Sequence, residues 1–151
     1  NGGLQEFGME YLESNTQELE ADYQYTAKDG SCETDAAKGK VLVTQIHEVE
    51  AKSIAQLKAA IAQGPVSVTI EADQTVFQMY KNGIFDSVAC GTELDHAVTA
   101  VGYGSEDGKD FYIVRNSWGA TWGEQGYIRI AAVEGEGICG IQQVSLWAST
   151  N

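Results

Sequence analysis

The chain has 151 residues, of which 43% are hydrophobic, so it is long enough to bury a core and too apolar to be disordered. Nine basic residues against twenty-two acidic ones give a net charge of −13, which argues against nucleic acid or an anionic membrane surface as a partner. No run approaches the roughly 20 apolar residues that a membrane span requires.

The beginning of the chain does not have the basic and apolar pattern of a signal peptide. We interpret the start Asn1-Gly2-Gly3 as a cut within a longer chain. The three cysteines, Cys32, Cys90 and Cys139, have no metal-binding spacing, so we expect neither a metal nor a cofactor. Their odd number predicts one disulfide and one cysteine whose partner lies on another segment, in an oxidising compartment.

The first 45 residues predict a helix followed by irregular chain. Apolar residues at Leu4, Phe7 and Tyr11 follow the period of an amphipathic helix over 4–15. Residues 16–40 show little periodicity, and 41–46 are rich in β-branched residues, which predicts a strand.

The rest of the chain predicts one helix and a series of strands. Ser53 and Gln56 have the spacing of a capping box for a helix that ends at Gly64-Pro65. A strand over 66–70 and a helical turn at 76–80 follow, and further strands are expected over 96–104, 110–116, 126–132 and 143–148. The predicted fold class is therefore α+β, an antiparallel β-barrel-like domain over 46–151 with one packed helix, preceded by a helix-and-loop remnant over 1–45.

The strands 96–104 and 110–116 predict the candidate site. Joined by the turn-rich segment 105–109, they form an antiparallel hairpin that brings His96 and Asn116 to the same end. An amide there can orient an imidazole, and an oriented imidazole can act as a general base for a nucleophile. Taken one at a time, a core histidine and a turn asparagine are the simpler interpretations.

Four motifs in this half of the chain are similar to those of one family. The chain closely resembles the papain-like cysteine peptidases of the cathepsin L type, from Asn1-Gly2-Gly3 to Cys139-Gly140-Ile141. The motifs are Asp95-His96-Ala97-Val98, Gly102-Tyr103-Gly104, Arg115-Asn116-Ser117-Trp118-Gly119 and Trp122-Gly123-Glu124-Gln125-Gly126-Tyr127.

The resemblance implies roles for three side chains. His96 would share a proton with a cysteine thiolate, and Asn116 would fix the tautomer and tilt of the imidazole. Trp118 would cover their hydrogen bond and keep water away from it. A thiol paired with a histidine loses its proton far below its usual pKa of about 8.5, which gives a nucleophile at acidic pH.

The nucleophile itself is not found in this chain. In the family it lies about 130–150 residues before the histidine and asparagine, and only 95 residues precede His96. The resemblance implies a Cys90–Cys139 disulfide and a bond from Cys32 to the preceding segment. The oxyanion glutamine is also expected upstream, so this chain alone is predicted to be inactive.

The resemblance also implies a substrate site. Gly2 and Gly3 would bind the main chain of an extended substrate. A mostly apolar pocket would accept a bulky hydrophobic side chain two residues before the scissile bond. Its predicted lining is Gln5, Val66, Asp95, Ala97 and Val144.

The predicted function is that of an endopeptidase that hydrolyses peptide bonds through a thioester acyl-enzyme. Two alternatives stay open: a non-catalytic homologue with serine in place of the cysteine, and a stand-alone peptide-binding or inhibitory β module. The implied partners are peptide substrates, the preceding segment of the same protein, and a propeptide or cystatin-like inhibitors. The implied location is the lysosome, the vacuole or the outside of the cell.

Overall fold

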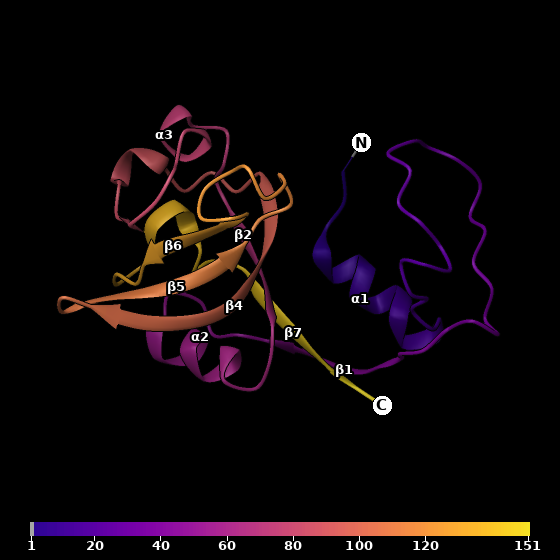
Figure 1. The fold of residues 1–151 in the computed structure, drawn as a ribbon. Helices are drawn as coiled ribbons and strands as arrows, with labels where there is room; N and C mark the ends of the chain where they lie inside the picture. The colour runs from indigo at the N-terminus through magenta and orange to yellow at the C-terminus, as the bar shows by residue number, and fades with distance from the viewer. Residues whose placement is uncertain (1) are drawn as a thin grey trace. The chain divides into compact units, whose positions relative to one another are not determined.

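The computed structural model describes residues 2–151 and divides the chain into two compact units (Figure 1). The first unit ends at His47 and includes the last residues, Ala148–Asn151, and the second unit is Glu48–Trp147. Asn1 of the predicted Asn1-Gly2-Gly3 segment lies outside the described residues. Over 2–151, no helix has the length and apolar character needed to cross a membrane.

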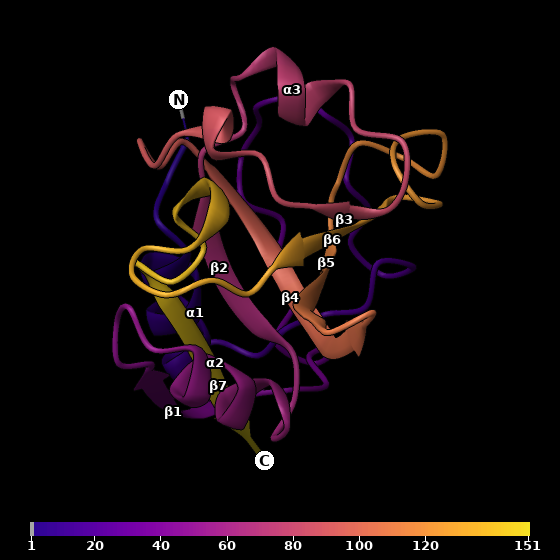
Figure 2. The same cartoon turned by 90° about the vertical axis from the view of Figure 1, so that its left-hand side faces the viewer.

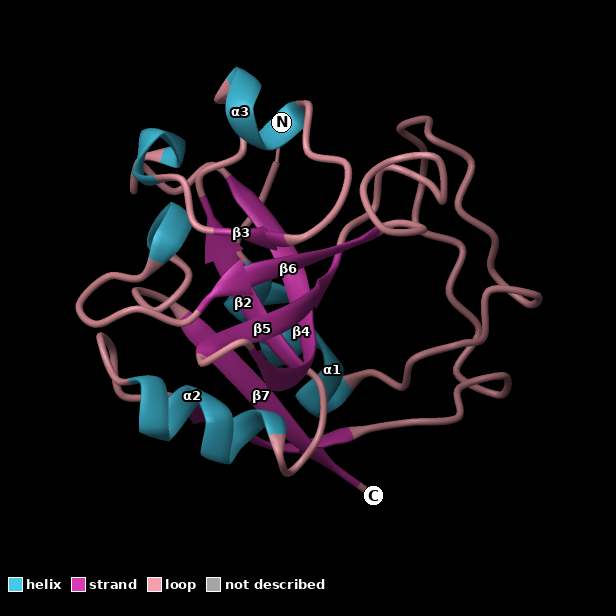
Figure 3. Cartoon of the chain, turned by 60° about the vertical axis from the view of Figure 1, so that its left-hand side comes forward, coloured by secondary structure: helices cyan, strands magenta, loops and turns pink. Residues whose placement is uncertain are grey.

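In the first unit, the predicted helix is confirmed as α1 (Gln5–Ser14). It ends where the backbone N–H of Asn15 donates to the carbonyl of Tyr11, 3.1 Å away. None of its side chains is buried within the structure. Residues 16–42 contain no helix and no strand longer than an isolated bridge, as Figure 3 shows for the long pink loop.

β1 (Val43–Glu48) closes the first unit, close to the strand predicted at 41–46. It lies beside the C-terminal part of β7 (Ser145–Thr150). The backbone N–H of Leu42 donates to Asn151 Oδ1 at 2.9 Å, and His47 Nε2 lies 2.9 Å from Ser149 Oγ. These contacts tie the C-terminal residues of the chain to β1 and the residue before it.

In the second unit, six strands follow the order β7-β2-β4-β5-β6-β3 (Figure 2). The α+β class is confirmed, but the sheet has two edges and does not close into a barrel. β3 is a short strand that the sequence analysis missed, and its pairing with β6 is parallel whereas the other described pairings are antiparallel. The bounds are β2 (Val66–Ile70), β3 (Ile84–Phe85), β4 (His96–Glu106), β5 (Lys109–Arg115) and β6 (Tyr127–Ala131).

The predicted helix after Ser53 is confirmed as α2 (Ile54–Ile61), which packs against β4. Ser53 Oγ accepts a hydrogen bond from the backbone N–H of Gln56 at 3.3 Å, which satisfies one free donor of the first turn. Leu57 and Ile61 are buried in the core. Lys58 adds an ion pair to Asp110, so α2 is tied to the β4–β5 hairpin.

Three short helices connect the strands: α3 (Thr75–Gln78), η1 (Val88–Cys90) and η2 (Ile138–Gly140). A disulfide joins Cys90 of η1 to Cys139 of η2, as the family resemblance implied. Because it closes a loop with a sequence separation of 49, it contributes about 4 kcal/mol in the chain-entropy account.

A buried carboxylate fixes the segment between η1 and β4. Glu71 accepts hydrogen bonds from the backbone N–H of Glu93 at 2.5 Å and from Gln74 Nε2 at 3.0 Å. Gly91 has a φ of +78°, and a Cβ there would lie 2.2 Å from a Glu71 carboxylate oxygen. The close approach of this segment to Glu71 therefore requires glycine, and it determines where β4 begins.

Leu57→Ala is expected to destabilise the protein by about 2–5 kcal/mol, because the change leaves a cavity between α2 and the sheet. Val88→Ala is the matched control, since Val88 is 86% exposed and its truncation leaves no cavity. Chemical denaturation measures both free energies of unfolding. Equal losses in the two variants would show that α2 is not part of the core.

Residues 1–45 are expected to exchange their backbone amides faster than 46–151. α1 buries no side chain and 16–42 is mostly loop, whereas the second unit has a continuous core and sheet. Hydrogen exchange measured by mass spectrometry at peptide resolution tests this. Equal protection in the two segments would contradict it.

Candidate active site

The pairing of β4 with β5 brings His96 and Asn116 together. His96 is the first residue of β4, and Asn116 directly follows the last residue of β5. The two strands are antiparallel, with Thr99 opposite Arg115, so these two ends meet at one end of the hairpin. A register shift between Ala100 and Gly102 adds a local bend to β4.

The imidazole of His96 is held by the amide of Asn116. His96 Nε2 lies 2.9 Å from Asn116 Oδ1, and the same oxygen accepts the backbone N–H of Ser117 at 2.7 Å. Because the Ser117 amide can only donate, the atom facing it must be the amide oxygen. Nε2 therefore carries the proton toward Asn116, and Nδ1 of a neutral His96 is left as the basic atom.

Aromatic rings cover this pair. Trp118 stacks on His96 with ring centroids 5.2 Å apart and an angle of 29° between the planes. Edge contacts to Phe77 and Trp122, at 5.6 and 5.4 Å, hold Trp118 in this position. Trp122 itself is buried, and its indole N–H donates to the carbonyl of Gln78 at 3.0 Å. The hydrogen bond between His96 and Asn116 is therefore flanked by apolar surface.

Asp95 anchors the residue before the histidine. Its backbone N–H donates to the carbonyl of Ile70 at 3.0 Å, and its carboxylate accepts the backbone N–H of Ala72 at 2.8 Å. Ile70 also lies opposite His96 in the β2–β4 register. The end of β2 thus fixes the backbone position of His96.

No described residue of the second unit offers a free thiol to His96. Cys90 and Cys139 are joined in the disulfide. Cys32 belongs to the first unit and is exposed, and a hydrogen bond from Thr34 lowers the pKa of its thiol. The site therefore holds an imidazole and the amide that orients it, without a free thiol from the same unit.

Comparison with known proteins gives one family match for the chain. Residues 1–148 match the family described as papain family cysteine protease. The chain belongs to the papain family. The predicted resemblance is thereby confirmed over nearly the whole chain.

Members of the papain family are similar to this chain in both sequence and structure. It is 50% identical over 145 residues to the probable cysteine protease RD21B of Arabidopsis thaliana, covering 93% of this chain and 31% of that protein. It is 42% identical over 149 residues to chymopapain of Carica papaya, covering 97% of this chain and 42% of that protein. The chain thus spans less than half the length of these curated relatives.

Solved structures confirm the papain-like fold. The bromelain protease of Ananas comosus, solved with the inhibitor E64, superposes with a TM-score of 0.89 at 38% identity, covering 98% of this chain and 70% of that one. Digestive procathepsin L 3 of Tenebrio molitor gives a TM-score of 0.92 at 32% identity, covering 98% of this chain and 49% of that one.

The residues predicted to bind substrate fall in both units. Gly2 and Gly3 are exposed and precede α1, of which Gln5 is the first residue. In the second unit, Ala97 is exposed on β4 and Val144 is exposed just before β7. These positions are compatible with the predicted roles, which stay predictions.

Val66 requires a correction, because its side chain is 0% exposed and lies in the hydrophobic core. Thr69, on the same strand, faces the opposite way from Val66 and was not among the predicted residues. It lies opposite Ala97 in the β2–β4 register, and its backbone N–H donates to the carbonyl of Val144 at 3.1 Å. The alternation along 66–70 was the available signal, since Val66, Val68 and Ile70 all face inward.

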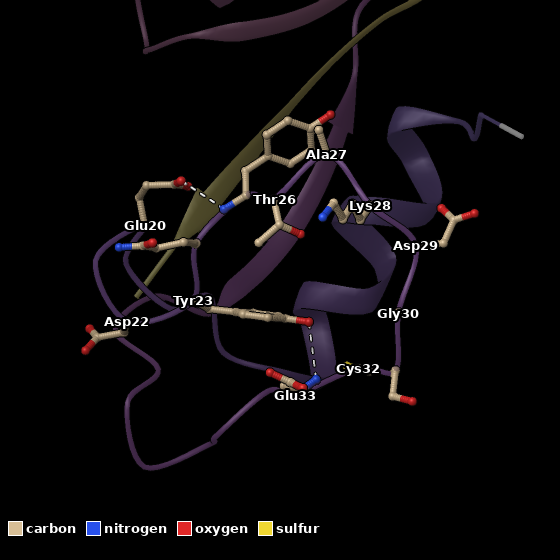
Figure 4. A pocket seen from close by; sticks show the side chains of 13 residues that line it. Glu20, Asp22, Tyr23, Thr26, Ala27, Lys28, Asp29, Gly30, Cys32 and Glu33 are labelled. Atoms are coloured by element: carbon tan, nitrogen blue, oxygen red, sulfur yellow. Dashed lines mark hydrogen bonds between the residues drawn. The ribbon is translucent and has the colours of Figure 1, made fainter.

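A separate cavity of about 880 Å³ lies in the first unit, within the loop 20–33 (Figure 4). Two hydrogen bonds shape this loop: Glu20 accepts the backbone N–H of Tyr25 at 3.0 Å, and the Tyr23 hydroxyl accepts that of Glu33 at 3.2 Å. Neither His96 nor Asn116 lines it. This cavity is therefore not part of the candidate active site.

Asn116→Ala is expected to remove the preference of neutral His96 for the tautomer protonated on Nε2. Without Oδ1, no acceptor holds the proton on Nε2, so neutral His96 becomes a mixture of its two tautomers. Nitrogen NMR of histidine-labelled protein distinguishes the tautomers by the shifts of the two ring nitrogens. His47 provides an internal reference, and an unchanged His96 spectrum in the variant would contradict the orienting role.

Proposed function

We propose that the complete protein is a cysteine endopeptidase of the cathepsin L type, in which His96 is the general acid and base and Asn116 orients it. The observation that most supports this proposal is the hydrogen bond between His96 and Asn116, which lies under the stacked ring of Trp118. Family membership supports the reaction class. The thiol would come from a part of the protein outside these 151 residues, since no described thiol lies in the same unit as His96.

The proposed reaction follows from the free Nδ1 of His96. Nδ1 takes the proton of the thiol, and the thiolate adds to the substrate carbonyl carbon. The imidazolium then gives that proton to the leaving amine as the peptide bond breaks, which leaves a thioester. His96 next removes a proton from water, which attacks the thioester, and the acid and the thiol are released.

Asn116 suits this cycle because its amide remains neutral. The thiolate already balances the charge of the imidazolium, and a carboxylate in place of the amide would add an unpaired charge when the thiol is protonated. The cover of Trp118 keeps the orienting hydrogen bond away from water, which would compete for Nε2.

For the substrate, we propose a hydrophobic side chain two residues before the scissile bond. In the second unit, Thr69, Ala97 and Val144 would form the wall that contacts it, with Asp95 at the side. Gly2, Gly3 and Gln5 of the first unit are assigned to substrate binding by the family resemblance alone. The proposed setting is a vacuolar, lysosomal or extracellular one, which the Cys90–Cys139 disulfide supports.

One alternative has a specific observation in its favour. A non-catalytic homologue would keep the His96–Asn116 pair but have serine at the nucleophile position, and the second unit offers no free thiol of its own. Determining the residue at that position in the full-length protein decides between the two. Cysteine supports the peptidase, and serine supports the non-catalytic homologue.

His96→Ala in the full-length protein is expected to lower kcat/KM for a hydrophobic dipeptide amide by at least about 10²-fold, because the acid and base are both lost. His47→Ala is the matched control, since His47 pairs with Ser149 and has no proposed role in the reaction. Rates measured at saturating and at limiting substrate give kcat and kcat/KM for both variants. Unchanged turnover in His96→Ala, with an unchanged unfolding temperature, would refute the proposal.

A further inference from the structure

Glu71 is a buried acidic residue that the proposed reaction does not use. It directly follows β2 and is only 5% exposed. None of the ion pairs among residues 2–151 includes it. A carboxylate buried without a cation opposes folding unless its oxygens accept hydrogen bonds, so the partners of Glu71 indicate what this side chain does.

Both oxygens of Glu71 accept hydrogen bonds, and one of them holds the chain that leads to His96. One oxygen accepts the backbone N–H of Glu93 at 2.5 Å, and the other accepts Gln74 Nε2 at 3.0 Å. A backbone N–H and an amide NH₂ can only donate, so each needs an acceptor oxygen. Gly91 allows the close approach, because a Cβ there would lie 2.2 Å from a carboxylate oxygen.

Three successive residues at the end of β2 hold the segment before β4. The carbonyl of Ile70 accepts the backbone N–H of Asp95 at 3.0 Å, and the backbone N–H of Ala72 donates to the Asp95 carboxylate at 2.8 Å. Glu71 lies between them in the sequence and contacts Glu93. The Asp95 contacts fix the last residue before β4, whereas the Glu71 contact fixes the chain two residues earlier. Together they set the direction in which the chain enters β4.

The backbone of Glu71 is in turn anchored beside the disulfide. Its N–H donates to the carbonyl of Cys139 at 2.9 Å, and Cys139 is bonded to Cys90. Gly91, the residue after Cys90, then packs against the Glu71 carboxylate. A side chain with a fixed backbone and with both oxygens engaged is a rigid support for the residues that it contacts.

We propose that Glu71 is a positioning residue for the reaction of His96: its carboxylate holds segment 91–95 in the place from which His96 Nδ1 meets the thiol. The carboxylate touches neither the substrate nor the reacting atoms, and it acts through the backbone alone. A misplacement of about 1 Å can lower a rate by about 10²-fold, so a support this close to the base affects turnover. The catalytic part of this inference rests on the proposed function, while the placement of the imidazole does not.

Three variants of the full-length protein separate the contact made by Glu71 from its charge. Glu71→Gln keeps the size of the side chain but turns an NH₂ group toward one of the two donors. Glu71→Asp keeps the charge but is one methylene shorter, so it loses the contact to the backbone of Glu93. Glu93→Gln is the matched control, because its side chain is exposed and its backbone N–H makes the contact to Glu71.

Both Glu71 variants are expected to lower kcat/KM for a hydrophobic dipeptide amide about tenfold. They are also expected to move the acid limb of the pH profile to higher pH by about 0.5, because a displaced imidazolium stabilises the thiolate less. Loss of a negative charge would by itself lower the pKa of the thiol and move the limb the other way. Glu93→Gln is expected to change kcat/KM by less than about twofold.

A second measurement does not depend on turnover. Nitrogen NMR of histidine-labelled protein is expected to show changed ring shifts of His96 in both Glu71 variants, with the shifts of His47 unchanged as an internal reference. If the wild-type protein has no turnover, the proposed function fails, and the NMR spectra still decide whether Glu71 places the imidazole.

Three outcomes would overturn the proposal. Equal effects of Glu71→Gln and Glu93→Gln on kcat/KM would show that the contact has no part in the reaction. An acid limb that moves to lower pH in Glu71→Gln and stays in place in Glu71→Asp would show an effect of charge alone. A lower unfolding temperature with an unchanged pH profile and unchanged His96 shifts would show that Glu71 only stabilises the fold. If Glu71→Gln does not fold, Glu71→Asp makes the same test with the charge in place.

Discussion

The candidate site of the second unit centres on one interaction, the hydrogen bond between His96 and Asn116. These residues are 20 apart in the sequence, and only the antiparallel pairing of β4 with β5 brings them within 2.9 Å. The buried core residues of those strands, including Tyr112 and Val114, fix that pairing. Any change that shifts the register by one residue would turn the side chains of the shifted strand to the other face of the sheet and separate His96 from Asn116.

The surroundings of this bond have two different sides. On one side, Trp118 stacks on the imidazole of His96 and packs edge-on against Phe77. On the other side, the amide nitrogen of Asn116 is buried and has no partner in the described residues. The oxygen of Asn116 therefore contacts His96, while its nitrogen is enclosed.

Much of the fold could be predicted because the local signals were strong. Residues close together in the sequence indicate three features: the capping of α2 by Ser53, the alternation over 66–70 and the hairpin around 105–109. β3 was missed because two residues carry no detectable period, and its pairing with β6 connects distant segments. Val66 does not line an open pocket because it belongs to the inward-facing set of β2, and the family resemblance carried no information about which face of the strand it occupies.

The sequence by itself determined the α+β class, the family and the pair His96 and Asn116, since motif order and strand periodicity are properties of neighbouring residues. Only the tertiary structure decided the tautomer of His96, the place of Thr69 beside Ala97 and Val144, and the open edges of the sheet. It also showed that Asn116 Nδ2 has no partner among residues 2–151. These features depend on which atoms meet across strands, and a hydrogen bond between distant residues exists only once the chain has folded.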